Sequence, residues 1–170
     1  MVKIPQLKDE YVKDINIILN NSLASVDPFL CVSKYIEFEG NKLKIAKTII
    51  DLTEIENIYI IGIGKASIAM AKAVVSKFGE KISGGLLISK IQGGVIEEFK
   101  ENKLEVHIGS HPIPDRRSQE CALRLVEFVK KINPNDLIIT LISGGGSALM
   151  TLPYEGISLN KLQELTDILL

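Results

Sequence analysis

The chain contains few cysteines and no cluster of metal-binding residues. Its two cysteines, Cys31 and Cys121, lie far apart in a sequence of 170 residues and match no spacing typical of a zinc or redox motif. Histidines and carboxylates do not add a group with metal-ligand spacing. The two thiols are therefore expected to be buried and reduced, which favours a cytoplasmic protein with no metal site of its own.

The sequence also lacks a long apolar segment and an excess of charge of either sign. Its most apolar runs, 58–63 and 137–142, are far shorter than the ~18 residues that suggest a membrane span. The first ten residues have no apolar signal core. Lys and Arg (20) nearly balance Asp and Glu (21), whereas a nucleic-acid-binding surface is strongly basic. We expect a soluble protein that binds neither membranes nor nucleic acids.

The length suits one domain, and a hydrophobic content of 46% suits a sheet covered by helices. Short apolar runs alternate with amphipathic segments, which is typical of a parallel sheet. Strands are expected over 58–63, 84–89, 104–108 and 137–142, and helices over 9–23, 68–78, 115–131 and 158–170. We predict an α/β fold, a Rossmann-like three-layer sandwich with a mostly parallel sheet, plus a small two-stranded β-ribbon (35–45) and an N-terminal helix.

Two of the predicted strands carry more specific expectations. Residues 137–142 are apolar and largely β-branched, so we expect a strand that is buried on both faces. Residues 104–108 alternate between apolar and polar side chains, which places that strand nearer an edge of the sheet.

A glycine-rich loop follows the last predicted strand. Gly144, Gly145 and Gly146 stand between Ser143 and Ser147. Glycine adopts positive φ at low cost and lets a backbone approach a ligand, and Ser147 is expected to cap the helix that begins here. Free amides at a helix start attract negative charge, so the loop predicts an anion-binding site. A tight turn without a ligand is the alternative.

A second glycine loop follows residues 58–63. It contains Gly62, Gly64 and Lys65, and a helix begins at about Ser67, so its amides are expected to form a second anion-binding cradle. Lys65 is a candidate for holding a phosphate group, and a solvated lysine in the first helical turn is the alternative. Ser67 stands where the dinucleotide fingerprint requires a third glycine, and the Walker spacing is not met either.

A third loop follows residues 104–108 and contains two prolines that restrict its backbone. His111 in this loop is a candidate for orienting a substrate hydroxyl, or a histidine bonded within its own loop. Asp115 is either a site carboxylate or the N-cap of the next helix. Because ligands of such folds bind at the carboxyl ends of the strands, we expect all three loops to meet at one edge of the sheet.

These three loops together resemble the glycerate 2-kinase (MOFRL-type) family. The resemblance covers nearly the whole chain from Asp9 onward, and it depends on three motifs in the order of the family: Gly62-Ile63-Gly64-Lys65-Ala66, Ser110-His111-Pro112-Ile113-Pro114-Asp115, and Ser143-Gly144-Gly145-Gly146-Ser147-Ala148-Leu149.

The resemblance implies an ATP-dependent kinase that phosphorylates D-glycerate at its 2-hydroxyl, with Mg²⁺ assisting. By analogy, Lys65 is the basic residue of the active site. The family's cleft would be bordered by Gly62, Gly64, Ser143, Gly144, Gly145, Gly146 and Ser147, and lined by Ser110, His111 and Asp115. A non-catalytic module that binds a phosphorylated metabolite is one alternative, and an NAD(P)H-dependent hydroxypyruvate reductase is another.

One departure from the family concerns length. Family members are much longer, and a carboxy-terminal domain closes their site. We therefore expect residues 1–170 to be the amino-terminal domain of a glycerate kinase, with little or no activity alone. Its expected partners are D-glycerate and either a second copy of the chain or a separate carboxy-terminal domain.

Overall fold

The computed structural model describes residues 9–90, 99–101 and 103–170. The helices of this part are α1 (Asp9–Ser25), α2 (Pro28–Ser33), α3 (Ser67–Phe78), α5 (Arg116–Val129), α6 (Gly146–Leu149) and α7 (Leu159–Leu169), with short 3₁₀ turns at Leu52–Glu54 and Gly79–Lys81. The strands are β1 (Ile36–Glu39), β2 (Lys42–Ile45), β3 (Thr48–Asp51), β4 (Ile58–Ile63), β5 (Gly84–Ser89), β6 (Leu104–Ile108) and β7 (Leu137–Ile142).

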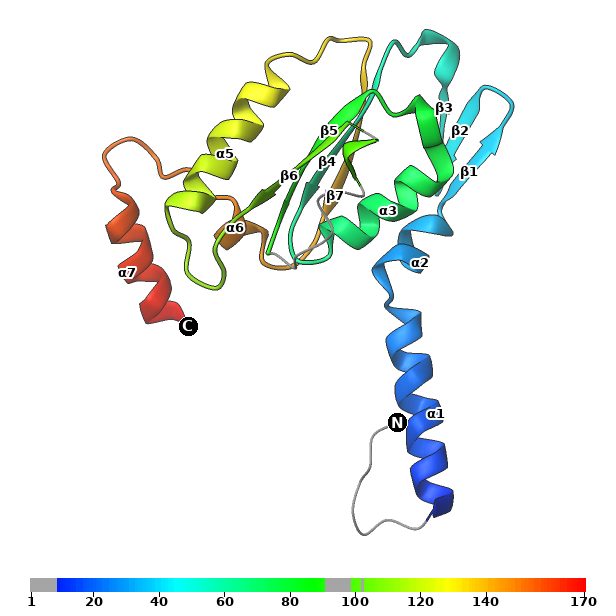
Figure 1. The fold of residues 1–170 in the computed structure, drawn as a ribbon, viewed down its shortest axis with the longest axis horizontal. Helices are drawn as coiled ribbons and strands as arrows, with labels where there is room; N and C mark the ends of the chain where they lie inside the picture. Colours follow the sequence, from blue (N-terminus) through cyan, green and yellow to red (C-terminus); the bar gives the residue numbers. More distant parts are fainter. Residues whose placement is uncertain (1–8, 91–98, 102) are drawn as a thin grey trace.

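The main sheet has four parallel strands in the order β6-β5-β4-β7 (Figure 1). Ile61 in the middle of β4 pairs with Leu86 of β5 and with Thr140 of β7. Helix α3 packs on one face of this sheet, and helices α5 and α6 pack on the other. The predicted three-layer α/β sandwich is confirmed, and β6 lies at an edge as its alternating sequence predicts.

Neighbouring residues of β5 point into two separate hydrophobic cores. Leu87 packs with Phe78 and other residues of α3, whereas Leu86 packs with Cys121 of α5 and with Leu149 of α6. Burial raises the pKa of the Cys121 thiol to about 11, so this thiol is protonated and unreactive near neutral pH. The sequence prediction of a buried thiol is confirmed for this cysteine.

The small β-ribbon has three antiparallel strands where the sequence predicted two. Strands β1 and β2 pair across the turn at Gly40, which has a φ of +61°, and β3 pairs with β2. Phe38 joins the ribbon to α3, because its ring meets the ring of Phe78 edge-on at 4.9 Å. The chain turns into β3 at Ala46, which has a φ of +52°. Alanine is not a residue that signals such a turn, so sequence patterns did not reveal this strand.

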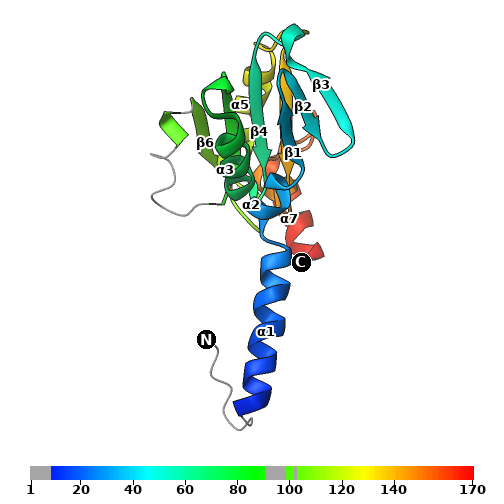
Figure 2. The ribbon, with the colours of Figure 1, turned by 90° about the vertical axis from the view of Figure 1, so that its right-hand side faces the viewer.

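Helix α1 projects away from the sandwich, as Figure 2 shows, and within the described residues it contacts α2. Its amphipathic spacing agrees with the sequence prediction, but apolar residues such as Ile18 and Leu23 are exposed. The helical structure is interrupted between α1 and α2. There the carboxylate of Asp27 accepts a hydrogen bond from the Leu30 amide and caps α2. Within the described residues, no helix combines the length and apolarity that crossing a bilayer requires.

Three sequence predictions need correction. Strand β7 is buried on one face only: it lies at an edge of the sheet, and Ile142 is 70% exposed. Ser147 does not cap α6, because Gly145 occupies the N-cap position and Ser147 lies within the first turn. Cys31 is half-buried, with its thiol near the Ser25 carbonyl, whereas the sequence predicted a buried thiol.

Candidate active site

The loops after β4 and β7 meet at the carboxyl edge of the main sheet. The Lys65 amide donates to the Gly144 carbonyl at 3.0 Å, and the Ala66 amide donates to Ser143 Oγ at 3.0 Å. Gly64 has a φ of +120°, and a Cβ there would collide with Ser143, so only glycine allows the two loops to approach this closely. The prediction that both glycine loops open at the same edge is confirmed.

The loop after β6 brings His111 to the same place. A Cβ placed on Gly145, which has a φ of +90°, would lie 2.8 Å from His111 Cδ2, 3.0 Å from His111 Nε2 and 3.3 Å from Lys65 Cγ. The absence of a side chain at Gly145 therefore lets the imidazole and the lysine stem converge on the glycine loop. Three of the predicted site residues, each from a different loop, lie together.

The two glycine loops differ in the amides that they offer. The amides of residues 64–67 all have acceptors within the protein, at Ile88, Gly144, Ser143 and Gly64. This loop therefore contributes the Lys65 side chain, and its predicted role as an amide cradle is not supported. By contrast, the amides of residues 144–147 donate to no acceptor within the described part of the chain. The amides available to an anion are those of the Gly144–Ser147 loop.

Gly62 lies inside β4 and not in the loop that follows it. A Cβ at this position would lie 2.6 Å from Leu87 Cδ2 and 3.2 Å from Ser67 Cβ, so Gly62 permits close packing of α3 on the sheet. The Ser67 hydroxyl is buried and donates to the Ile88 carbonyl at 3.1 Å. The structure gives Gly62 a packing role, and contact between Gly62 and a ligand stays a prediction.

The loop that carries His111 is held in place by the start of α5. Ser118 is buried, and its Oγ accepts from the Ser110 amide at 2.9 Å. Asp115 is the N-cap of α5 and forms a capping box with Ser118. The carboxylate of Asp115 also binds the Arg117 guanidinium at 2.8 Å, and this hydrogen-bonded ion pair lowers the pKa of Asp115. The N-cap alternative for Asp115 is confirmed, and the carboxylate orients the loop through α5.

The site is positively charged. Partial burial lowers the pKa of His111, and the positive charges of Lys65 and Lys90 lower it further. The imidazole is therefore neutral near pH 7 and keeps one nitrogen able to accept a hydrogen bond. Lys90 follows β5 directly, and Lys65 follows β4 after one residue, Gly64. The sequence analysis missed Lys90, although its place at a strand end was the signal that identified the other loops.

Comparisons with known proteins agree with this arrangement. A family described as a domain of unknown function, DUF4147, matches residues 14–170. The chain belongs to this family. DUF4147 is the amino-terminal domain of the glycerate 2-kinases, so the family resemblance seen in the three loops is confirmed.

Two curated relatives and one solved structure illustrate the similarity. A D-glycerate 2-kinase from Thermotoga maritima is 37% identical over 68% of this chain and 27% of its own length. A glycerate 2-kinase from Pyrococcus horikoshii is 33% identical over 90% of this chain and 33% of its own length. The crystal structure of a protein from Pyrococcus horikoshii OT3 superposes with a TM-score of 0.76 at 29% identity, over 99% of this chain and 36% of that chain. This DUF4147 chain thus spans about a third of the length of its relatives.

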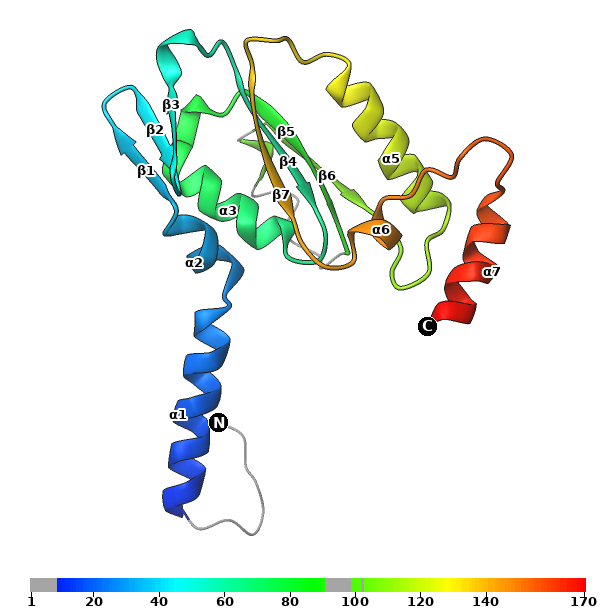
Figure 3. The ribbon, with the colours of Figure 1, turned by 180° about the vertical axis from the view of Figure 1, so that it is seen from behind.

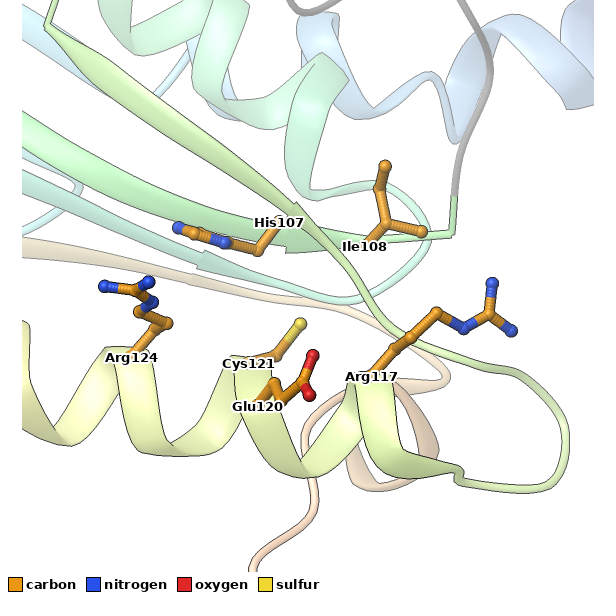
Figure 4. Close-up of a pocket in the computed structure, with 6 residues that line it drawn as sticks. All are labelled: His107, Ile108, Arg117, Glu120, Cys121 and Arg124. Atoms are coloured by element: carbon orange, nitrogen blue, oxygen red, sulfur yellow. The ribbon is translucent and has the colours of Figure 1, made fainter.

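A shallow cavity of about 240 Å³ lies beside the site, between β6 and α5 (Figure 4). None of Lys65, His111 and the 144–147 loop lines this cavity. Three of the titratable residues that line it have partners outside it: His107 with Glu105, Arg117 with Asp115, and Glu120 with Arg116. The cavity is therefore separate from the edge of the sheet where the three loops meet.

The lowered pKa of His111 predicts a pH-dependent loss of stability. The unfolded chain binds a proton at this histidine as the pH falls through ~6.5, whereas the folded chain resists protonation until the pH reaches the lowered pKa. The free energy of unfolding should therefore decrease as the pH is lowered from ~6.5 to the lowered pKa of the folded state. We expect a smaller loss in His111→Gln than in the original protein when urea unfolding is compared at about pH 7.5 and about pH 5.5. An equal loss in both proteins would contradict the assignment.

Proposed function

We propose that this chain forms the amino-terminal half of the active site of a glycerate kinase, which transfers a phosphoryl group from ATP to the 2-hydroxyl of D-glycerate. The observation that carries the proposal is the convergence at one edge of the sheet of Lys65, His111 and the amides of residues 144–147, which donate to no acceptor among the described residues. ATP and glycerate are both anions, and this edge carries two lysines beside a neutral histidine. The names of the relatives add support for the substrate.

Each group has a distinct part in the proposed reaction. The amides of residues 144–147 hold phosphate oxygens of the bound ATP, which supplies the phosphoryl group. The Lys65 ammonium offsets the negative charge that spreads over the transferred group in the transition state. His111 accepts a hydrogen bond from the glycerate hydroxyl through Nε2. This ring nitrogen faces the glycine loop, because it lies 3.0 Å from the place of a Cβ on Gly145. This contact orients the hydroxyl oxygen toward the phosphorus atom.

Magnesium does not fit the side chains at this edge. The described residues contain no group of three or more His, Cys, Asp or Glu side chains that can hold a metal ion. The charged side chains near His111 are lysines, and the carboxylate of Asp115 is already bound by Arg117. Mg²⁺ prefers carboxylate, phosphate and water oxygens, so we assign none of its ligands to the described residues and derive no step through it.

The reductase alternative has less support from the local geometry. In the dinucleotide-binding turn, the third glycine allows close packing of helix and strand, and Ser67 stands at that position. Its hydroxyl points into the sheet at Ile88, and Gly62 supplies the close approach of α3. Because the amides after β4 are used within the protein, this turn offers no pyrophosphate cradle of the dinucleotide-binding type.

Calorimetric titration of the 170-residue chain tests the proposal. ATP, D-glycerate and NADH are titrated separately into the original protein and into Lys65→Met. We expect the original protein to bind ATP, and we expect affinity to fall about tenfold in the variant, because a charge-assisted contact is lost. Binding of NADH in preference to ATP would favour the reductase. Binding of glycerate or a sugar phosphate without any nucleotide would favour the non-catalytic module.

A further inference from the structure

Lys90 stands at the carboxyl end of β5, between two of the three loops of the candidate site. In the sheet order, β5 separates β4 from β6. Ser89, the last residue of β5, is buried, and its hydroxyl donates to the Gly64 carbonyl at 3.2 Å. Its carbonyl accepts from the Gly109 amide at 3.2 Å. These two hydrogen bonds hold the backbone before Lys90 between the loop after β4 and the loop after β6.

The loop after β6 crosses the ends of β5 and β4 on its way to the glycine-rich loop. Strands β6 and β7 lie at opposite edges of the sheet, yet His111 lies beside Gly145 in the loop after β7. The crossing runs next to α6 (Figures 1 and 3), where a Cβ on Gly109 would collide with the Leu149 carbonyl. This path carries the imidazole across the part of the sheet edge where Lys90 stands.

The ammonium of Lys90 is available to a ligand. Its side chain is exposed, and among the described residues it has no hydrogen-bond or ion-pair partner. Partial burial lowers the pKa of His111, and the positive charges of Lys65 and Lys90 lower it further, so both lysines act on the same imidazole. Lys90 is thus a second cation beside the histidine, and the proposed reaction does not yet use it.

The two lysines differ in their position relative to the amides of residues 144–147. The Lys65 stem lies next to Gly145 itself. Strand β4 separates β5 from β7, so Lys90 starts one strand farther from these amides. Glycerate carries its carboxylate on the carbon that also bears the 2-hydroxyl. A group that binds this carboxylate must therefore lie near the group that orients the hydroxyl, which is His111, and not among the amides that hold phosphate.

We propose that Lys90 binds the carboxylate of the acceptor, so that the site selects 2-hydroxy acids over uncharged alcohols. This assignment rests on the proposed function. The Lys90 ammonium donates charge-assisted hydrogen bonds to the carboxylate while the 2-hydroxyl donates to His111 Nε2. Lys65 and the amides of residues 144–147 then remain for the phosphoryl donor. The binding of two anions at one edge is divided between two cations.

Titration of the 170-residue chain, followed by NMR, tests the proposal without depending on turnover. The probes are D-glycerate and D-glyceramide, in which a neutral amide replaces the carboxylate. We expect D-glycerate to bind at least about tenfold more tightly than D-glyceramide. Lys90→Met should reduce this preference to about threefold or less, whereas Lys90→Arg, which keeps the charge, should retain most of it. Lys77→Met, at an exposed lysine in the last turn of α3, should leave the preference unchanged.

The position of Lys90 is verified in the same samples without any ligand. Lys90→Met should raise the pKa of His111, because one of the two positive charges that lower it is removed. An equal preference for D-glycerate in Lys90→Met and in the original protein, or no preference in the original protein, would overturn the proposal. Weaker binding of inorganic pyrophosphate in Lys90→Met, with its preference for D-glycerate intact, would also overturn it and assign Lys90 to phosphate. The proposed function fails by a different result, the absence of ATP binding in calorimetry.

Discussion

Replacing Lys65 by methionine is expected to lower kcat/KM for glycerate phosphorylation about 100- to 1,000-fold. The experiment uses the protein that joins this chain to the carboxy-terminal part of the Pyrococcus horikoshii glycerate 2-kinase. Lys65 is exposed beyond the carboxyl end of β4. Its Cγ and the imidazole of His111 both lie close to the place of a Cβ on Gly145. The loss arises because the ammonium no longer offsets the charge of the transferred phosphoryl group. Turnover is measured by coupling ADP release to NADH oxidation.

Lys77→Met is the matched control for this variant. Lys77 is an exposed lysine in the last turn of α3, the helix that follows the Lys65 loop, and it lies away from the glycine loops. The two variants remove the same charge and keep a side chain of similar length. Equal kcat/KM values for Lys65→Met and Lys77→Met would show that Lys65 is an ordinary surface lysine.

The 170 residues alone are expected to turn over glycerate at least about 1,000-fold more slowly than the joined protein. Phosphoryl transfer depends on charged groups held in a cleft that excludes water, and here Lys65, Gly144 and Ser147 are exposed. The same coupled assay measures both proteins, and circular dichroism with ATP calorimetry verifies that the short chain is folded and binds nucleotide. Comparable turnover by the two proteins would mean that this half of the site suffices for catalysis.

The sequence predicted most of the sandwich because its signals are local. Apolar runs next to glycines marked β4, β5 and β7, and of the two roles considered for Asp115 the structure shows the N-cap role. The partial burial of β7 was not predictable in this way. Its apolar, β-branched run is the same whether a neighbouring strand is present or absent, and burial depends on that neighbour.

The site was predicted in its location and only partly in its detail. Strand ends and glycines placed Lys65, His111 and Gly145 at one edge, because parallel strands share a direction. The sequence did not show which amides are free. That outcome depends on hydrogen bonds between residues 77 to 79 positions apart, such as the one from the Ala66 amide to Ser143 Oγ. The N-cap of α6 likewise depends on the backbone conformation of Gly145. A run of three glycines does not specify which of them adopts this conformation.

The central claim is that Lys65, His111 and the 144–147 amides form one anion site. NMR titration of the 170-residue chain with inorganic pyrophosphate tests this claim most directly. We expect the amide resonances of residues 144–147 to shift with a single dissociation constant. The pKa of His111 should rise as the bound anion counters the two lysines, and both effects should weaken together in Lys65→Met. Pyrophosphate that binds elsewhere, or that shifts these amides without changing the titration of His111, would contradict the account.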